Sequence, residues 1–439
     1  MSVKTHIHPT AHGLWADTAQ TAPATASLNG SFTTEIAVVG AGFTGLSAAL
    51  HLASAGREVT VIDTGDVGQG CSGRNGGQVN PGWKLDLSGI ANHYGSSGAG
   101  EEGATKAVGV ALQAVPYLSS LIRAEGIDCD FIENGYVQGA IGARGLASIQ
   151  GRAEEWRSFG IEAEILGAAE AESLLGTDVY DGIMHHAQGG NLQPLSFARG
   201  LAKAVLAKGG QIFTQTRALS TQRDGDDWVI KTEAGQIRAK QILIATNGYT
   251  DSFWPGLSEA VVSVASSLSA TEPLSPEVAT SILPGLHSVS ETRRIQVYYR
   301  MTVDGRFVIG GRGQTFGQAE GSPTAHVRAI AEQYFPALKG VRWTHDWAGT
   351  VAMTWDSAPK LMQMDEGVIA GMGYNGRGVA MSTMMGAILA CAAQGEATDL
   401  PITAPFKTPF HAFRKIGVQW TVTKGRFLDS LERRVKGSE

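Results

Sequence analysis

The apolar pattern of the chain is clearest between residues 36 and 63. Four consecutive apolar residues, typical of a buried strand, stand at 36–39 and lead into a glycine-rich turn. Apolar residues then recur at i, i+3, i+4 and i+7, which predicts a helix with one apolar face. These residues are Leu46, Ala49, Leu50 and Ala53. A second strand-like run at 58–62 ends in Asp63, whose carboxylate would accept hydrogen bonds from a ribose.

The order strand, glycine turn, helix, strand and acid predicts a Rossmann-like nucleotide-binding unit. Gly40 permits the tight turn, Gly42 lets the backbone approach a pyrophosphate, and Gly45 lets helix and strand touch. Phe43 and Thr44 lie in the first helical turn. The unpaired N–H groups and the positive dipole end of that turn would attract phosphate.

A second glycine-rich segment at 68–78 helps to decide between two candidate cofactors, NAD and FAD. The glycine turn alone fits both NAD and FAD, because both contain ADP. The flavin half of FAD extends past the pyrophosphate and needs a cation, hydroxyl groups and backbone N–H groups, for which a NAD-dependent dehydrogenase has no obvious use. The residues expected to bind FAD here are Ser72, Gly73, Arg74, Asn75, Gly76, Gly77 and Gln78. A flexible surface loop is the alternative interpretation.

These motifs resemble those of the FAD-dependent amine and amino-acid oxidoreductases of the D-amino-acid oxidase and glycine oxidase superfamily. The resemblance rests on GCSGRNGGQ at 70–78 and GYNGRGV at 373–379. It continues through further segments at 15–18, 189–195, 242–248, 298–300, 310–311 and 347–349. Within the superfamily the chain is most similar to the γ-glutamylputrescine oxidoreductases, with pipecolate oxidase-like and glycine oxidase-like proteins as neighbours.

The resemblance implies a mixed α/β fold. A Rossmann-like FAD-binding domain would be interleaved with a substrate domain built on a mainly antiparallel sheet. We expect the FAD-binding domain at 35–95, 165–250 and 341–400, and the substrate domain at 96–164 and 251–340. An extended N-terminal arm at 1–34 and a basic C-terminal tail at 401–439, packed on the FAD-binding domain, complete the chain.

A second cofactor-binding turn is expected between a strand-like run at 368–372 and a helix of small residues at 379–393. The resemblance implies that this turn faces the flavin, where the helix N-terminus would stabilise negative charge near N1 and O2. The residues expected to bind FAD are Gly373, Asn375, Gly376, Arg377, Gly378 and Val379, with Ala218 elsewhere in the chain. A purely structural core helix is the alternative.

We expect FAD to be bound non-covalently. Some relatives attach FAD through a histidine just after the first loop or through a cysteine in the C-terminal half. Here Arg74 and Asn75 occupy the loop, and Cys391 lies deep in the predicted helix.

The implied reaction is oxidation of an amine by transfer of a hydride equivalent to flavin N5, which gives an imine that water hydrolyses. Such chemistry needs orientation and exclusion of water more than acid–base catalysis. Tyr299, Arg312, Trp355 and Tyr374 are expected to line the substrate pocket, with Arg312 on a substrate carboxylate. An exposed or domain-bridging Arg312 is the alternative. Three alternative functions of the whole chain stay open. They are a pipecolate or other secondary amino-acid oxidase or dehydrogenase, a NAD-dependent dehydrogenase, and a non-catalytic nucleotide-binding module.

Composition limits the classes of partner and metal site that are expected for the chain. The 439 residues carry 35 Lys and Arg against 41 Asp and Glu, and the net charge of −6 disfavours nucleic acid as the main partner. Three cysteines without CxxC spacing argue against a disulfide framework and a zinc site. Histidines such as His185 and His186 lack carboxylate or Cys company at ligand spacing, so no metal is expected. Without an apolar leader, the chain is expected to be cytoplasmic.

The C-terminal residues 407–439 hold eight basic and three acidic residues interleaved with aromatic ones. This composition fits contact with an anionic membrane and electron transfer to quinone, but we favour a stripe of Phe406, Phe410 and Phe413 that covers the FAD-binding domain. Sarcosine oxidase-like relatives use a lysine near flavin N5 to promote reaction with oxygen. No lysine occurs between Lys240 and Lys339, so we expect oxygen to be a slower acceptor than a quinone or other carrier. The oligomeric state stays open.

Overall fold

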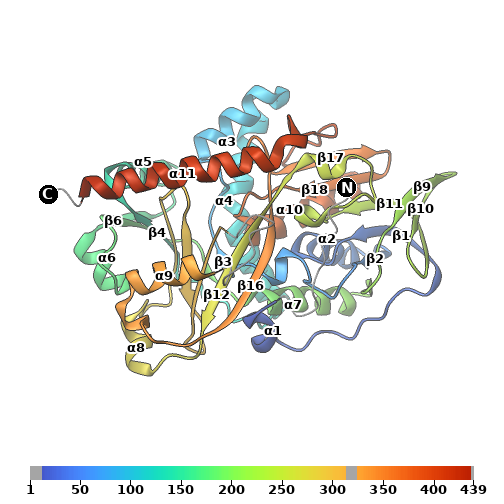
Figure 1. Ribbon diagram of the computed structural model, residues 1–439. Coiled ribbons are helices and arrows are strands. Elements are labelled where there is room, and N and C mark those ends of the chain that lie inside the picture. Colours follow the sequence, from blue (N-terminus) through green and yellow to red (C-terminus); the bar gives the residue numbers. More distant parts are fainter. Residues whose placement is uncertain (1–11, 313–323, 437–439) are drawn as a thin grey trace.

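The computed structural model describes residues 12–312 and 324–436, and two large sheets dominate it (Figure 1). The first sheet has the order β17-β18-β11-β1-β2-β8, and its central strands are parallel. These strands are β1 (Gly30–Val39), β2 (Val59–Ile62), β8 (Gln211–Phe213), β11 (Gly235–Ile244) and β18 (Val368–Met372). Three antiparallel strands extend it, namely β9 (Ser220–Asp224), β10 (Asp227–Lys231) and β17 (Lys360–Asp365).

Helices of small and apolar residues pack on this sheet. α2 (Phe43–Ser54) follows the glycine turn, and α10 (Gly378–Ala393) lies against it. A Cβ atom on Gly386 would lie 2.5 Å from Thr44 O, so glycine at this point allows the close approach of the two helices. The layer also contains α3 (Leu87–Tyr94), α4 (Gly100–Ala124) and α7 (Pro194–Ala207).

By length and composition α4 could cross a membrane. However, 56% of its most apolar window is buried within the protein. This burial is what the core helix of a globular domain shows.

The second sheet has the order β16-β12-β15-β14-β13-β4-β6-β5 and lies to the left of the first in Figure 1. All its pairs are antiparallel except β13 with β4. Its strands are β4 (Tyr136–Ala140), β5 (Ala163–Gly167), β6 (Gly182–His186), β12 (Val262–Thr271), β13 (Ser288–Glu291), β14 (Val297–Met301), β15 (Phe307–Arg312) and β16 (Trp343–Met353). The associated helices are α5 (Gly142–Ser158), α6 (Ala168–Leu175), α8 (Pro276–Ser281) and α9 (Ala325–Tyr334), and β3 (Gln78–Val79) and β7 (Gly190–Asn191) form a separate small sheet. The mixed α/β architecture with a mainly antiparallel second sheet is as predicted.

The sheets divide the chain differently from the predicted domain boundaries. β6 and β16 belong to the second sheet, although 165–250 and 341–400 were assigned to the FAD-binding domain. Conversely, α4 packs on α3 and α10, although 96–164 was assigned to the substrate domain. The chain crosses between the sheets several times, and strands from both have the same local pattern, so sequence alone could not fix the crossings.

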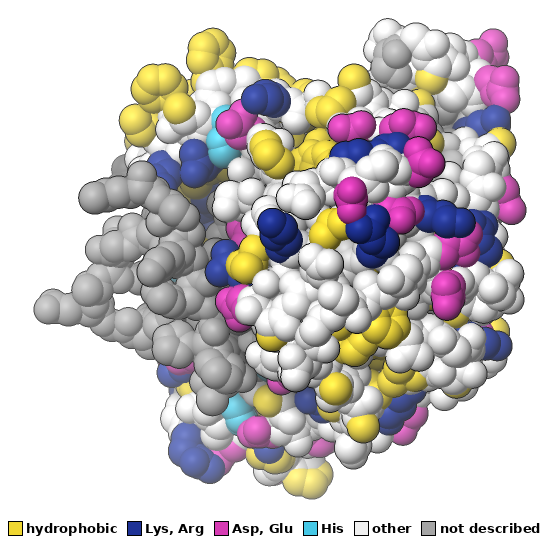
Figure 2. Space-filling model, turned by 90° about the vertical axis from the view of Figure 1, so that its right-hand side faces the viewer, with side chains coloured by type: hydrophobic (Ala, Val, Ile, Leu, Met, Phe, Trp, Pro, Cys, Tyr) yellow, Lys and Arg dark blue, Asp and Glu magenta, His cyan; other side chains and the backbone are white. Residues whose placement is uncertain are grey.

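The C-terminal tail also departs from its prediction. Phe406 is half-buried against the first sheet, but Phe410 and Phe413 are 81% and 64% exposed. Figure 2 shows hydrophobic side chains gathered at the upper left of the face drawn there. The helix α11 (Arg414–Lys436) lies along the second sheet, where Asp429 pairs with Arg294. Contacts on this inner side turn the aromatic stripe outward, so it does not cover the FAD-binding domain.

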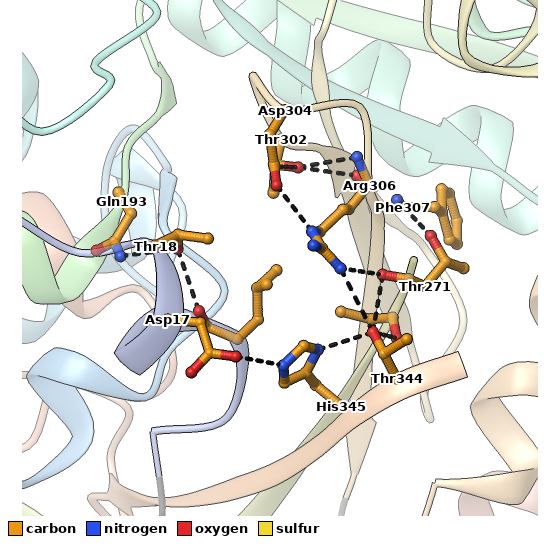
Figure 3. Close-up of polar contacts among 12 residues, drawn as sticks. Asp17, Thr18, Gln193, Thr271, Thr302, Asp304, Arg306, Phe307, Thr344 and His345 are labelled. Carbon is orange, nitrogen blue, oxygen red and sulfur yellow. Dashed lines mark hydrogen bonds and ion pairs between the residues drawn. The ribbon is translucent and has the colours of Figure 1, made fainter. Parts of the chain in front are cut away.

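The N-terminal arm is not simply extended. It contains a short helix, α1 (Leu14–Thr18), with Trp15 fully buried. Asp17 Oδ2 lies 2.9 Å from His345 Nε2 of β16, and Gln193 Nε2 donates to Thr18 Oγ1 at 3.1 Å (Figure 3). The arm thus joins β16 to the start of α7.

Candidate functional site

The glycine turn lies at the carboxyl edge of the first sheet. Gly40 has φ +118°, and a Cβ atom on it would lie 2.8 Å from Ala245 O of the neighbouring strand end. A Cβ atom on Gly45 would lie 1.9 Å from Gly40 O, so both positions require glycine. The N-terminus of α2 therefore opens into the crevice where the strands end, which is the usual dinucleotide position.

Asp63 follows β2 at the same edge. Its Oδ2 accepts a hydrogen bond from Ala41 N at 2.7 Å, and its Oδ1 accepts one from Gly65 N at 2.9 Å. Burial raises the pKa of Asp63 to about 6, although the two backbone donors oppose that shift. The two backbone donors thus fix the orientation of this carboxylate at the edge of the sheet, and its contact with a ribose stays a prediction.

Ser72 joins the second glycine-rich segment to α2. Its Oγ accepts a hydrogen bond from Phe43 N at 2.9 Å. A Cβ atom on Gly42 would meet this Oγ at 2.8 Å, with no other heavy atom closer than 3.7 Å. Space above Gly42 is therefore open to a pyrophosphate.

Two tryptophans hold the segment 74–77 from outside. Trp347 Nε1 donates to Arg74 O at 2.9 Å, and Trp15 Nε1 donates to Asn75 O at 2.8 Å. The buried Arg300 lies over the Trp15 ring and donates to Gly77 O at 3.4 Å. The second sheet and the arm thus hold the carbonyl groups of the segment, while Arg74 N and Asn75 N donate to Cys71 O at 3.1 and 3.0 Å, so the backbone path of the loop is fixed from both sides. Sequence reasoning missed Trp15, Trp347 and Arg300 as site residues, although all three stand in segments that carry the resemblance.

Arg74 tests whether the site fits FAD. Its side chain is 6% exposed, and its Nε and Nη2 have no hydrogen-bond partner among the described residues. A buried guanidinium needs acceptors, and the phosphate or carbonyl oxygens of FAD would provide them. The residues present fit the cofactor.

Other predicted ligands use their side chains within the protein. Asn75 Oδ1 accepts from Gly77 N at 2.8 Å, and its Nδ2 donates to Cys71 O at 3.0 Å. Gln78 Nε2 donates to Val289 O at 3.0 Å in the second sheet. These two side chains shape the loop, and a direct contact of either residue with FAD stays a prediction.

Glycines fix the remaining loop contacts. A Cβ atom on Gly73 would lie 2.4 Å from Gly68 O, one on Gly76 2.8 Å from Tyr298 Cε2, and one on Gly77 2.1 Å from Leu192 O. The loop can therefore pack closely against Gly68, Tyr298 and Leu192 only because these three positions have no side chain.

The turn at 373–378 closes the same edge, after β18. Asn375 has φ +55°; its Oδ1 accepts from Thr354 N at 2.8 Å, and its Nδ2 donates to Gly373 O at 2.7 Å. Its side chain thus shapes the turn. Arg377 extends away and donates to Pro81 O at 2.8 Å. The N-terminus of α10, at Gly378 and Val379, has no side-chain cap.

Ala218 is a buried core residue between β8 and β9. It lies in the same apolar cluster as Leu28 and Trp228. Its contact with FAD stays a prediction.

Tyr299 was the wrong choice for a pocket residue. It is buried in an aromatic cluster with α9, and its hydroxyl lies 2.8 Å from Tyr180 Oη. Side chains alternate along β14, so Tyr298 takes the opposite face, towards Gly76. Its hydroxyl lies 2.9 Å from Ser266 Oγ. Burial raises the pKa of Tyr298 to about 12, so the hydroxyl stays protonated.

The other predicted pocket residues have different positions. Trp355 is 67% exposed and lies in the turn after β16, so it does not line a buried pocket. Tyr374 is buried, and its hydroxyl lies 2.7 Å from Thr44 Oγ1, which ties the 373–378 turn to α2. Arg312 pairs in register with Ser266 and shares the sheet face of Tyr298. Its role stays a prediction.

No group of three or more His, Cys, Asp or Glu residues forms a candidate metal site within 12–312 and 324–436. The three cysteines are free thiols.

Comparison with known protein families shows the family to which this chain belongs. The family described as FAD dependent oxidoreductase matches residues 35–392, which is most of the chain. The protein belongs to this family. The match decides for FAD over NAD and against a module without catalysis.

Curated relatives match nearly the whole chain. The γ-glutamylputrescine oxidoreductase of Escherichia coli is 30% identical over 413 residues, 93% of this chain and 95% of the relative. The probable oxidoreductase OrdL of Haemophilus influenzae is 32% identical, covering 90% of this chain and 92% of its own. Glycine oxidase from Geobacillus kaustophilus shares the fold, with a TM-score of 0.72, 21% identity, and coverage of 87% of this chain and 99% of its own. This FAD-dependent oxidoreductase therefore has the fold of glycine oxidase.

Acid or heat is expected to release the FAD of this oxidoreductase intact. Burial raises the pKa of the Cys71 thiol to about 11, so the cysteine nearest the loop is not a thiolate at neutral pH. The measurement is the flavin absorbance of supernatant and pellet after acid precipitation. A yellow pellet would contradict non-covalent binding.

Acid is expected to destabilise the fold through His186. Its ring packs on Trp156, and burial lowers its pKa to about 4, with Arg377 and His185 lowering it further. Because the unfolded chain binds the proton near pH 6.5, His186 favours the fold fully above that pH and loses this contribution as the pH falls towards 4. The loss amounts to about 1.4 kcal/mol per pH unit. Denaturant unfolding across this range should show a shallower slope for His186→Gln; an unchanged slope would contradict the assignment.

Proposed function

We propose that this oxidoreductase oxidises an amine or amino-acid-derived substrate at the carbon bearing nitrogen, with γ-glutamylputrescine-like amines as the first candidates. The proposal rests on the likeness to γ-glutamylputrescine oxidoreductase over 93% of the chain. Because this likeness includes the second sheet as well as the glycine turn, it bears on the substrate side of the molecule.

The face of the second sheet towards the glycine-rich loop supports this proposal. It presents the aromatic groups Tyr298, bonded to Ser266, and Trp347, bonded to the loop backbone, together with the cations Arg300 and Arg312. Burial and neighbouring positive charges both disfavour an ammonium group, so this face favours the uncharged amine, which is the form that can give up hydride. When bound, FAD supplies the hydride-accepting atom. The protein's part is to orient the amine and to exclude water.

A secondary amino acid such as pipecolate is the second candidate substrate. The observation in its favour is a pair of half-buried arginines, Arg152 and Arg377, beside the 373–378 turn. A substrate carboxylate would suit them.

The test is anaerobic mixing of the holoenzyme with γ-glutamylputrescine, pipecolate, sarcosine, glycine and D-amino acids. Bleaching of the oxidised flavin absorbance by an amine supports the proposal, and the fastest amine names the substrate. If none of these bleaches the flavin while dithionite does, the proposal is wrong.

We further propose that oxygen is a slower acceptor than a quinone. In sarcosine oxidase-like relatives a lysine near the flavin promotes the oxygen reaction, and none occurs between Lys240 and Lys339. Stopped-flow reoxidation of the reduced enzyme by air and by a soluble quinone compares the two rates. Faster reoxidation by air would contradict this prediction.

A further inference from the structure

One face of β4 carries two arginine side chains from separate elements. Tyr136 and Gln138 are two residues apart, so they lie on the same face of the strand. The Arg377 guanidinium lies 5.6 Å from the centre of the Tyr136 ring, and Arg152 Nη1 donates to Gln138 Oε1 at 2.6 Å. The start of α10 and the middle of α5 therefore bring two cations to one short stretch of strand.

A third cation reaches the same place through the segment 81–84. Arg377 donates to Pro81 O at 2.8 Å. A Cβ atom on Gly82 would lie 2.9 Å from Trp156 Cζ2, one helical turn after Arg152. Lys84 follows directly. The packing of Gly82 on α5 brings the segment that carries Lys84 to the helix that carries Arg152. Desolvation lowers the pKa of Lys84, and the positive charges of Arg377 and Arg152 lower it further.

The nearby carboxylates are used elsewhere. Asp86 accepts from Gly89 N at 2.9 Å, and Glu155 accepts from Leu87 N at 3.0 Å and from Ser88 N at 2.7 Å. Both therefore cap the start of α3. Among the residues that the structure describes, no carboxylate forms an ion pair with any of the three cations. Asp86 and Glu155 oppose the lowering of the Arg152 pKa by burial and by Arg377, but they form no ion pair with it, so an anion bound here would relieve the repulsion among the three like charges.

We propose that Lys84, Arg152 and Arg377 form the anchor for the carboxylate of the amine substrate, an inference that rests on the proposed function. Arg377 belongs to the turn that follows β18, at the carboxyl edge shared with the glycine turn. The Arg377 side chain reaches from this edge to Pro81 and Tyr136, so the anchor is connected to the cofactor edge through the turn itself. The planar guanidinium groups suit a carboxylate, and the ammonium adds a third donor.

The test compares γ-glutamylputrescine with N-acetylputrescine, which keeps the amide and the primary amine but lacks the carboxylate. Arg152→Met is expected to lower the preference for the carboxylated substrate, measured as the ratio of the two kcat/KM values, by about 10- to 100-fold, as for a lost charged hydrogen bond. Most of the change should appear in KM. Arg152→Lys should recover part of it. The matched control is Arg157→Met on the same helix, whose Nε donates only to Ala153 O.

A binding measurement separates this inference from the proposed function. Glutarate is expected to perturb the flavin spectrum of the wild-type holoenzyme, and to do so more weakly in Arg152→Met and in Lys84→Met. Inorganic phosphate tests whether any anion suffices, and stronger binding of phosphate than of glutarate would overturn the carboxylate assignment. If no amine is oxidised but glutarate binding depends on Arg152, only the proposed function fails. If Arg312→Met removes the carboxylate preference and Arg152→Met does not, the anchor is Arg312 and the inference is wrong.

A second inference comes from the outward face of α11. Ile416, Trp420 and Phe427 recur at helical spacing on α11, Phe413 stands directly before the helix, and each is 62–69% exposed. The face opposite them is occupied, because Val422 is buried and Gly425 packs on Ile295. An amphipathic helix thus presents its aromatic side to solvent, unlike the helix of a self-contained globule.

We infer that this stripe rests on an anionic membrane surface. Arg414, Lys415, Lys424 and Arg426 accompany it, and Lys424 Nζ lies 4.9 Å from the centre of the Trp420 ring. Between residues 410 and 430 the one acidic residue, Asp429, is turned inward to Arg294. A positively charged helix with exposed aromatic residues suits the interface of a bilayer with anionic headgroups.

Flotation with phosphatidylglycerol vesicles tests this contact. The wild-type holoenzyme is expected to float at low salt, and less with phosphatidylcholine vesicles. Trp420→Ser with Phe427→Ser should remove flotation, whereas Val303→Ser, an exposed apolar control on another loop, should retain it. Absence of wild-type flotation, or a dimer in sedimentation that the double variant breaks, would overturn the inference.

Discussion

Replacing Gly42 with valine is expected to abolish FAD binding and to leave the fold of the chain intact. Gly42 has φ −91°, which other residues adopt readily, and its Cβ position is crowded only by the Ser72 hydroxyl. The side chain would instead fill the space above the start of α2, where a pyrophosphate approaches the backbone. We expect the Kd for FAD to rise at least about 100-fold, equivalent to about 2.8 kcal/mol.

Fluorescence titration of the apoprotein with FAD measures this change, and the melting temperature of the apoprotein checks the fold. Gly109→Ala in α4 is the matched control, because a Cβ atom there meets nothing within 4 Å. Retention of FAD by Gly42→Val would show that the pyrophosphate does not pass over this turn.

Glu291→Ala is expected to give the largest loss of stability. Glu291 is completely buried in β13, where it accepts from Arg293 Nε at 2.6 Å, Val297 N at 2.9 Å and Tyr334 Oη at 2.8 Å. Its removal leaves the buried Arg293 without its counter-ion, which costs about 3–5 kcal/mol. Denaturant unfolding measures the change in free energy.

Two variants make this prediction specific. Glu277→Ala, on the exposed helix α8, is expected to change the free energy of unfolding by less than about 0.5 kcal/mol. Adding Arg293→Met to Glu291→Ala should restore part of the loss, because the uncompensated charge is then removed. A loss below about 1 kcal/mol for Glu291→Ala would contradict the buried ion pair.

The site shows where sequence reasoning was sufficient and where it failed. The steric roles of Gly40 and Gly45 were predicted correctly because they follow from contacts close to one short unit, and spacing along the chain encodes such contacts. Asn75 and Gln78 were expected to act as ligands because they stand in the right loop, but their side chains hold the loop and the second sheet. Position in a motif fixes the backbone path more reliably than the target of a side chain.

Tyr299 illustrates the failure on a strand. The segment 298–300, Tyr-Tyr-Arg, was expected at the site as part of the resemblance. Which of the two tyrosines faces the loop depends on the strand register, because a shift by one residue exchanges the two faces. The sequence does not reveal that choice, because both faces of this strand are covered and apolar or aromatic residues stand at odd and even positions alike. Packing against α9 selects Tyr299, and the glycine-rich loop selects Tyr298.

The sequence by itself determined the nucleotide-binding unit, the mixed α/β class and the family, because each depends on glycines and apolar periodicities that lie close together in the chain. Tertiary structure alone decided what distant segments do to one another. It brought Trp15 and Trp347 onto the loop at 74–77, and it turned the aromatic side of α11 outward. It also gathered Arg152 and Arg377 on one strand face. These contacts join segments that are separate in the sequence, as with Trp347 and Arg74, which are 273 positions apart. They arise from the crossing of the chain between two sheets, which no local pattern records.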